Sequence, residues 1–518
     1  MLIHPETRSI VLTAKDPVAV QRAIKSSRCL SHPTYNMAVK HTEATTRTLR
    51  RMGYQVPAPI SVHYSWPGKY KPFSHQRVMS EFMTLHPKVF NLAQMGTGKT
   101  ASTLWAADYL MSLGSIRKVL ILTPLSTMDR VWANDIFDVL MHRNCVIAYG
   151  TRDQRLRALG QDVDFYIMNH EGVTISVVEQ ALRSHPEIDL IVVDEAGMFR
   201  NAQTKRYKAL KRVIGQRRLW LLTGTPCPNA PTDAWALARL VNPHGVPQYF
   251  GQFKRQTMVQ VSQYVWTPRP DAYVTAFKAM QPAVRFKKQD CLDLPPVTTT
   301  DRSADLTPKQ IRAVDTMRKT MQAEAQLVRI TAGNAADKIN KLRQIMCGVV
   351  KDTDTGDYIT LPHKPRVDVL KECIEEANAK VIVVVPFKGI IQSLEAEMGS
   401  YSVALINGDV PPRRRDEIIR KFKHEADPRV LLCHPKVMSH GLNLTEADTL
   451  IFYAPIYSND EFQQVTERFN RTGQTRKMTI IRMAAHPVEW KIFDMVDKKS
   501  NTQDSILDLY HSITSDEV

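Results

Sequence analysis

Short runs of aliphatic residues recur along two stretches of this chain, one before about residue 240 and one after about residue 375. Runs that lack polar alternation are typical of strands buried on both faces of a parallel sheet. We expect seven such strands, at 119–123, 165–168, 190–193, 219–222, 381–385, 430–433 and 450–453. Helical patterns such as 100–113 and 460–472 lie between them. This alternation predicts an α/β fold with two parallel-sheet lobes.

The stretch between the two groups of runs has a different pattern. Thr307, Pro308 and Gln310 supply a helix cap, a proline at the first helical position and a capping-box residue. Four apolar residues then follow at helical spacing: Ile311, Val314, Met317 and Met321. We therefore expect a mainly helical insert between the two lobes.

These changes of pattern divide the chain into five expected parts. They are an accessory segment (1–70), the first lobe (71–275), the helical insert (276–360), the second lobe (361–490) and a helical tail (491–518). The accessory segment carries turn signals and several arginines, which fit either a small domain or an ordered lead-in to the first lobe.

The chain is strongly basic, with 69 Lys+Arg against 52 Asp+Glu among 518 residues and a formal charge of +17. This excess favours a polyanionic partner, and nucleic acid over a membrane surface, although a basic enzyme without such a partner stays possible. Seven scattered cysteines without a C-x-x-C pair argue against a zinc module and a disulfide framework. We see no secretory signal or membrane span, and expect a cytoplasmic protein without membrane contact.

The strongest local motif is the segment 93–100, AQMGTGKT. A strict P-loop has glycine where Ala93 stands, but Gly96 and Gly98 can direct backbone N–H groups at phosphates. Lys99 would neutralise the outer phosphates of ATP, and the Thr100 hydroxyl would bind Mg²⁺. A glycine-rich turn before an ordinary helix is the alternative.

Two carboxylates follow the expected strand 190–193 directly. Ligands of parallel α/β sheets bind at the carboxyl ends of the strands, where Asp194 and Glu195 stand. Asp194 is placed to hold Mg²⁺, and Glu195 to accept a proton from the attacking water. Helix capping is the alternative. Together with the P-loop, the pair predicts an ATPase.

With these motifs, residues 71–490 resemble the Swi/Snf-like branch of superfamily-two helicases and DNA translocases. The resemblance implies two RecA-like lobes that hold ATP between them. It also implies that Gln76 reads the adenine and that Thr97 belongs to the phosphate loop. In the segment 464–474, Gln464, Arg468 and Arg471 match the last family motif, which implies that they bind ATP. Arg468 and Arg471 are three residues apart and can reach one anion, which fits arginines that stabilise the γ-phosphoryl charge; a solvated basic helix end is the alternative.

The same resemblance implies contacts with nucleic acid in both lobes. The matching residues are Pro124, Ser126, His170, Thr223 and Thr225 in the first lobe and His440 and Asn443 in the second. The segment Asp194-Glu195-Ala196-Gly197 departs from the family pattern, because Gly197 stands where a histidine is usual. That histidine helps to link the ATP site to the next motif, so the departure concerns coupling.

The resemblance implies an ATP- and Mg²⁺-dependent motor that moves on duplex or branched DNA, in a bacterial or phage-infected cell. Single-stranded DNA stays a possible partner, RNA is the less favoured one, and protein partners are not indicated. Two alternatives stay open: a strand-separating DNA or RNA helicase, and a nucleic-acid-binding motor subunit that recruits a nuclease.

Overall fold

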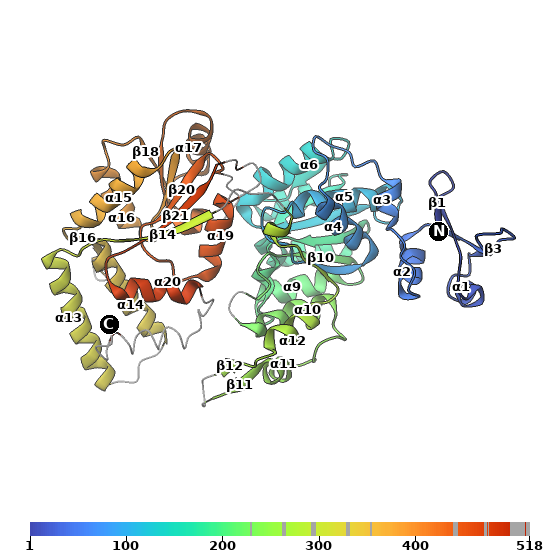
Figure 1. The fold of residues 1–518 in the computed structure, drawn as a ribbon, viewed down its shortest axis with the longest axis horizontal. Helices are drawn as coiled ribbons and strands as arrows, with labels where there is room; N and C mark the ends of the chain where they lie inside the picture. The colour runs from blue at the N-terminus through green and yellow to red at the C-terminus, as the bar shows by residue number, and fades with distance from the viewer. Residues whose placement is uncertain are drawn as a thin grey trace. The chain divides into compact units, whose positions relative to one another are not determined.

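A computed structural model describes residues 1–227, 230–261, 266–291, 297–327, 332–352, 355–438, 444–470, 474, 476–497 and 513 (Figure 1). They form two compact units, the first with nearly all described residues up to Cys291 and the second with those from Val297 onward. None of the described helices is long and apolar enough to cross a membrane.

The first unit is built on a seven-stranded sheet in which every pair of neighbouring strands is parallel. In spatial order the strands are β13 (Ala283–Val284), β5 (Lys88–Asn91), β10 (Arg218–Leu222), β9 (Ile188–Val193), β6 (Lys118–Thr123), β8 (Phe165–Asn169) and β7 (Cys145–Ile147). Since parallel strands share one direction, all seven carboxyl ends lie at the same edge.

Helices cover both faces of this sheet. Alternate residues of β9 join different hydrophobic clusters, with Ile191 and Val193 in one and Leu190 and Val192 in the other. The helices of the first unit's core are α3 (Pro59–His63), α4 (Ser74–Leu85), α5 (Lys99–Ser112), α6 (Asn134–Val139), α7 (Arg152–Leu159), α8 (Ser176–Ser184), α9 (Lys205–Ile214), α10 (Ala234–Val241), α11 (Phe250–Thr257) and α12 (Ala272–Ala279). Burial on both faces explains why these strands are continuous apolar runs.

The second unit repeats this architecture with a six-stranded parallel sheet. Its spatial order is β14 (Val297–Ser303), β21 (Met478–Ala484), β20 (Ala447–Phe452), β17 (Lys380–Val384), β19 (Val430–Cys433) and β18 (Val403–Ile406). The helices that follow its strands or precede them are α15 (Lys364–Glu376), α16 (Lys388–Glu397), α17 (Pro412–His424), α18 (Pro435–Met438), α19 (Asn459–Phe469) and α20 (Pro487–Asp497). The predicted α/β class with two parallel-sheet lobes is confirmed.

All seven strands expected from the aliphatic runs are present, each within three residues of its expected ends. The runs did not reveal the shorter or polar-interrupted strands, such as β5 and β21. In β21, Thr479 and Arg482 interrupt the apolar sequence, so the strand lacks the pattern of a buried run.

The stretch 276–360 is divided between the two units and is not one helical insert. Residues up to Cys291 belong to the first unit, where β13 pairs with β5. The strand β14 extends the second sheet beside β21. The helical part is α13 (Pro308–Leu327) and α14 (Ala332–Cys347), followed by the hairpin of β15 (Val349–Lys351) and β16 (Tyr358–Thr360). Thr307 and Gln310 form the expected cap, since the Gln310 backbone N–H donates to the Thr307 Oγ1 at 3.4 Å.

The first 58 residues form a small sheet of their own within the first unit. The antiparallel strands, in spatial order, are β1 (Leu2–His4), β2 (Ser9–Leu12), β4 (Met37–Lys40) and β3 (Arg28–Cys29). The helices α1 (Pro17–Ala23) and α2 (Glu43–Arg51) accompany them. A separate apolar cluster that includes Ile10, Met37 and Leu49 forms their core, which supports a small domain over an ordered lead-in.

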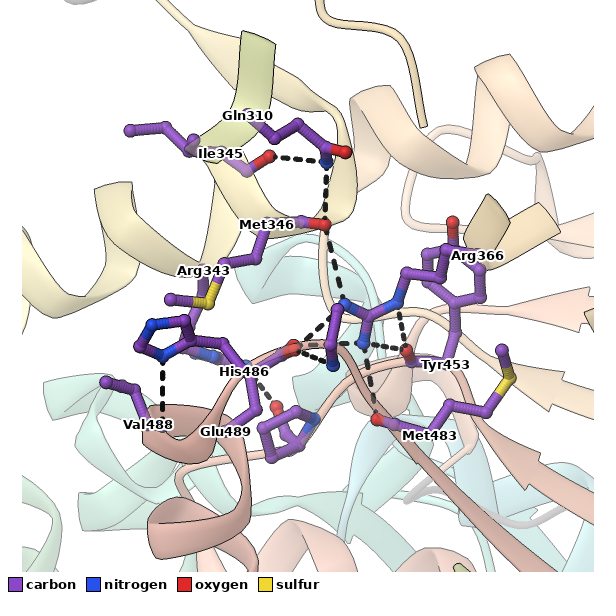
Figure 2. Close-up of polar contacts among 12 residues, drawn as sticks. Gln310, Arg343, Ile345, Met346, Arg366, Tyr453, Met483, His486, Val488 and Glu489 are labelled. Carbon is purple, nitrogen blue, oxygen red and sulfur yellow. Dashed lines mark hydrogen bonds and ion pairs between the residues drawn. The ribbon is translucent and has the colours of Figure 1, made fainter. Parts of the chain in front are cut away.

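A fully buried ion pair connects the ends of strands in the second sheet with α13 and α14, here called the helical pair (Figure 2). Arg366 is 1% exposed and Glu489 0%, and both guanidinium Nη atoms lie 2.9 Å from the carboxylate oxygens of Glu489. Arg366 also donates to two backbone carbonyls. One belongs to Tyr453, which directly follows β20, and the other to Met483, which lies in β21. Burial opposes the charge on Arg366, but the Glu489 carboxylate more than offsets it, so the pKa of Arg366 is raised.

A second buried arginine extends this cluster into α14. Arg343 is 3% exposed, donates to the Pro455 carbonyl and lies 5.0 Å from the ring centres of both Phe387 and Tyr457. The Gln310 side chain donates to the Met346 carbonyl at 2.9 Å, which joins α13 to the same cluster (Figure 2). The helical pair is therefore fixed to the second sheet by polar contacts as well as by apolar packing.

We predict that Glu489→Ala lowers the stability of the second unit by about 3–5 kcal/mol, because it leaves the buried Arg366 charge without its partner. Thermal unfolding of the full chain measures the effect. The double variant Arg366→Met/Glu489→Leu removes both charges and should be closer to wild type than Glu489→Ala. A double variant less stable than the single one would contradict this account.

Candidate active site

Three neighbouring strands bring the main motifs of the first unit to one edge of its sheet. The phosphate loop follows β5, the segment 223–225 follows β10, and Asp194 follows β9. The Thr223 backbone N–H donates to the Asn91 carbonyl at 3.1 Å, which fixes the end of β10 against that of β5. The parallel order therefore places the P-loop and the two carboxylates at one edge, with the segment 223–225 between them.

The P-loop has the backbone geometry of a phosphate cradle. Gly96 and Gly98 both have φ of +80°, a conformation that favours glycine, and α5 begins at Lys99 directly after them. The first N–H groups of a helix have no partner within the helix and attract anions. The Lys99 Nζ donates to the Ala93 carbonyl at 2.8 Å, and Ala93 itself is fully buried. The loop accordingly keeps its shape with alanine in place of the first glycine.

Residues from α4 lie against this loop. The ring Nε2 of His75 contacts the Thr97 carbonyl at 2.9 Å, and the Gln76 amide donates to the same carbonyl at 3.4 Å. A Cβ placed on Gly98 would lie 2.0 Å from the Gln76 Nε2, so no other residue fits at Gly98 without displacing that amide. Gln76 thus lies next to the P-loop, and its role in reading the adenine stays a prediction.

The segment that follows β13 also contacts this loop. The Gln94 backbone N–H donates to the Phe286 carbonyl at 3.0 Å, and the Gln94 side chain accepts from the Lys288 N–H at 2.7 Å. Sequence reasoning did not reveal these two contacts, because they join residues almost 200 positions apart. They fix the entry to the P-loop against the end of the first unit.

The Asp194 carboxylate is oriented by three donors. Its Oδ1 accepts from the Glu195 N–H at 3.0 Å, and its Oδ2 accepts from the Trp132 indole at 3.0 Å and from the Thr123 hydroxyl at 3.2 Å. Trp132 is completely buried and lies in a π-helical turn, Met128–Ala133. A carboxylate has about four acceptor positions, so one is left for a metal ion or its bound water.

Glu195 has an unusual backbone conformation. Its φ is +48° and its ψ is +50°, in the left-handed region that side chains with a Cβ rarely adopt. Such residues cost of order 1–3 kcal/mol and gather at functional sites. The bond from the Glu195 N–H to Asp194, together with that from the Met198 N–H to the Glu195 carbonyl at 3.0 Å, holds this conformation.

His170 is buried next to Asp194 and does not lie on the surface. It is 5% exposed, its Nε2 donates to the Asp194 carbonyl at 2.8 Å, and its ring meets the Phe199 ring edge to face. Burial lowers the pKa of His170 to about 4, so the ring is neutral at pH 7. A buried ring in this position is not available to nucleic acid, and the expected contact is corrected: His170 supports the backbone of Asp194.

The other expected nucleic-acid residues of the first unit differ in exposure. Thr223 is 1% exposed, so its side chain also supports the strand edge and does not face a partner. Pro124, Ser126 and Thr225 are half-buried, and they lie close to the carboxyl ends of β6 and β10. The Ser126 Oγ is itself buried. Contact of these three residues with nucleic acid stays a prediction.

Nothing around Gly197 requires glycine. An added Cβ would meet only the Arg200 Nη1, at 3.9 Å, which is an ordinary contact. The absence of the usual histidine is therefore not forced by local packing.

In the second unit, Gln464 and Arg468 lie four residues apart on α19 and therefore on one side of that helix. Arg468 is 5% exposed and Gln464 is half-buried. The Ser458 side chain caps α19 by accepting from the Glu461 N–H at 3.2 Å. Arg471, His440 and Asn443 lie outside the described residues.

The chemistry of the donors suits Mg²⁺ bound together with a triphosphate. Mg²⁺ keeps several waters and takes one or two protein oxygens plus phosphate oxygens. Asp194 and Thr100 supply such oxygens, and among the residues that the structure describes no group of His, Cys, Asp or Glu could hold a metal alone. The site therefore fits a metal that arrives with its nucleotide.

Two family models match the chain. One, described as an SNF2-related domain, matches residues 92–351, and the other, described as a helicase conserved C-terminal domain, matches residues 365–473.

Several individual proteins are similar to this chain at low sequence identity. An uncharacterized ATP-dependent helicase of Mycoplasma genitalium is 25% identical, over 78% of this chain and 39% of its own. The ATP-dependent DNA helicase DDM1 of Arabidopsis thaliana is 23% identical, over 77% and 56%. The SWI2/SNF2 ATPase core of Sulfolobus solfataricus, solved with double-stranded DNA, is 21% identical over 85% of this chain and 93% of its own, with a TM-score of 0.42. The chain spans 32–56% of the length of the first three curated relatives.

We predict that Trp132→Phe lowers ATP turnover about 10- to 100-fold and raises the Mg²⁺ concentration needed for half-maximal turnover, because Asp194 loses an orienting donor. The matched control is Trp220→Phe, which removes an indole donor to the His86 carbonyl at 3.4 Å, away from Asp194. An unchanged Mg²⁺ dependence in Trp132→Phe would contradict the proposed orientation.

Protonation of His170 gives a second prediction. The unfolded chain binds this proton near pH 6.5 and the folded chain only near pH 4, so folding stability falls as the pH drops through this window. His170→Gln keeps an N–H donor but does not titrate. We expect the difference in Tm between wild type and His170→Gln to shrink from pH 7.5 to pH 5; a constant difference would show that His170 is already charged in the fold or does not contribute.

Proposed function

The chain belongs to the SNF2-related family, and from that premise we propose that it is an ATP-hydrolysing motor that moves along double-stranded or branched DNA. The observation that carries this proposal is the edge of the first sheet, where the P-loop, the segment 223–225 and the pair Asp194-Glu195 follow three adjacent parallel strands. Nucleotides bind at this edge in parallel α/β sheets.

We assign the chemistry of ATP hydrolysis to residues of this edge. The N–H groups of the loop and Lys99 would bind the phosphates, and Gln76 the adenine. Glu195 would take the proton of the attacking water, and its strained backbone supports a fixed direction for its side chain. Thr100 and Asp194 would hold Mg²⁺, which neutralises phosphate charge when bound.

The second unit would complete the site when the two units close around ATP. Arg468 and Arg471 would stabilise charge on the γ-phosphoryl group, with Gln464 beside them on the nucleotide. The helix α19 supports this proposal because it presents Gln464 and Arg468 on one side. Closure with ATP and opening after hydrolysis would move the chain along DNA.

The proposed DNA contacts are mainly to phosphates. Pro124, Ser126 and Thr225 are candidates in the first unit, and His440 and Asn443 in the second. The net charge of +17 supports a polyanionic partner. The names of some relatives, such as the DNA helicase of Arabidopsis, favour DNA over RNA. Separation of strands, and service as a motor subunit for a nuclease, are the competing functions.

Displacement of a third strand from a DNA triplex tests movement on a duplex without strand separation. We predict ATP-dependent release of the third strand by wild type, and no release of either strand of the duplex beneath it. Glu195→Gln should bind ATP but lose about 10²-fold or more in turnover, since it removes the general base, and should release no third strand.

Separation of the duplex strands would favour the helicase alternative. Normal turnover by Glu195→Gln would exclude Glu195 as the base. Release of the third strand by Glu195→Gln would show that the displacement does not depend on hydrolysis.

A further inference from the structure

The small domain at 1–58 lies outside both stretches that match the family models. It carries nine Lys and Arg against three Asp and Glu, a net charge of +6. About a third of the charge of the whole chain is thus concentrated in about a ninth of its length. Such a local excess of one sign is the electrostatic footprint of a polyanionic partner.

Most of these basic side chains are exposed and have no acidic partner. Seven of them form no ion pair within the described part of the chain: Arg8, Lys15, Arg22, Lys25, Arg28, Lys40 and Arg51. Some exposed cations of the neighbouring parallel-sheet region do have acidic partners, such as Arg117 with Asp189. The domain therefore keeps its positive charge available.

The strand register places two of these cations on one open face of the small sheet. On the other face Ile10, Leu12, Met37 and Val39 are at most 2% exposed and pack in the domain core. The intervening positions of β4 are Ala38 and Lys40, and Arg28 pairs with Ala38, so Arg28 and Lys40 share the open face. Diagonal neighbours in a sheet lie about 7–8 Å apart.

Small, uncharged residues fill the centre of this open face. Ala38 pairs with Val11, and Lys40 pairs with Ser9, whose own partner in β1 is His4. Ser9, Val11 and Ala38 are half-buried, and Leu2, which pairs with Val11, is 47% exposed. Exposed basic side chains beside uncharged residues fit a phosphodiester backbone, because proteins contact phosphates mainly through Arg, Lys and polar groups.

We propose that this open face, defined by Ser9, Val11, Arg28, Ala38 and Lys40, is a second DNA-binding surface that contacts the phosphates of duplex DNA. The proposal rests on the proposed function only in its choice of DNA as the polyanion. The arrangement of charge is independent of the motor motifs.

The small domain is joined to the ATP site through α2 and α4. The Arg47 Nη1 donates to the Leu85 carbonyl at 2.9 Å, and the Arg50 guanidinium lies 3.9 Å from the Glu81 carboxylate. The helix α4 also carries Gln76, which lies against the P-loop. DNA held by this surface would stay at high local concentration near the motor, so we expect it to affect the DNA concentration needed for stimulation more than the maximal rate.

The test uses the full chain with Arg28→Glu/Lys40→Glu. We expect the affinity for a short blunt DNA duplex to fall about tenfold or more, and the slope of log K against log salt to become shallower by about 2, one unit for each lost phosphate contact. ATP turnover without DNA and the Tm should match wild type, because neither residue belongs to the ATP site. The control Arg152→Glu/Arg157→Glu changes the charge equally, on α7.

Unchanged affinity and salt slope in Arg28→Glu/Lys40→Glu would overturn the proposal, and so would an equal loss in the α7 control, which would show a general effect of charge. A selective loss of binding to duplex RNA or to anionic vesicles, with DNA binding unchanged, would also overturn it.

If the variant loses DNA binding but DNA never stimulates ATP turnover of wild type, the second surface stands and the proposed motor fails. If DNA stimulates wild type and the variant binds normally, the motor stands and this surface fails.

Discussion

The common direction of the strands in the first sheet is the constraint on which the proposed chemistry depends. Because all seven strands are parallel, their carboxyl ends lie at one edge, and the order of β5, β10 and β9 makes three motif-bearing ends adjacent. Residues separated by almost 100 positions, such as Lys99 and Asp194, reach one edge in this way. Side-chain contacts then refine the positions that the backbone has set.

Asp194 is the residue at which most of these contacts meet. Trp132 and Thr123 bind its carboxylate, His170 binds its carbonyl, and its own Oδ1 holds the strained Glu195. Of these partners, Trp132 lies in a π-helical turn, Met128–Ala133, and Thr123 ends β6. A shift in the turn that carries Trp132 would therefore act directly on the carboxylate that we assign to Mg²⁺.

The sequence was sufficient for the fold class, because buried strands leave clear local patterns. The roles of the ATP motifs stay predictions. The sequence was insufficient where burial depends on distant partners. His170 fits a surface motif by position but is buried under Asp194, and Arg366 finds Glu489 at a distance of 123 residues. Strands such as β5, with two apolar residues between a lysine and an asparagine, gave no clear run.

The most direct test of the motor is ATP turnover by wild type and Lys99→Ala, without nucleic acid and with duplex DNA, forked DNA, single-stranded DNA or RNA. Our account predicts strong stimulation of wild type by duplex or forked DNA, and almost no turnover by Lys99→Ala under any condition. Stimulation by single strands or RNA alone would contradict movement on duplex DNA. Turnover that no nucleic acid changes would contradict the motor itself.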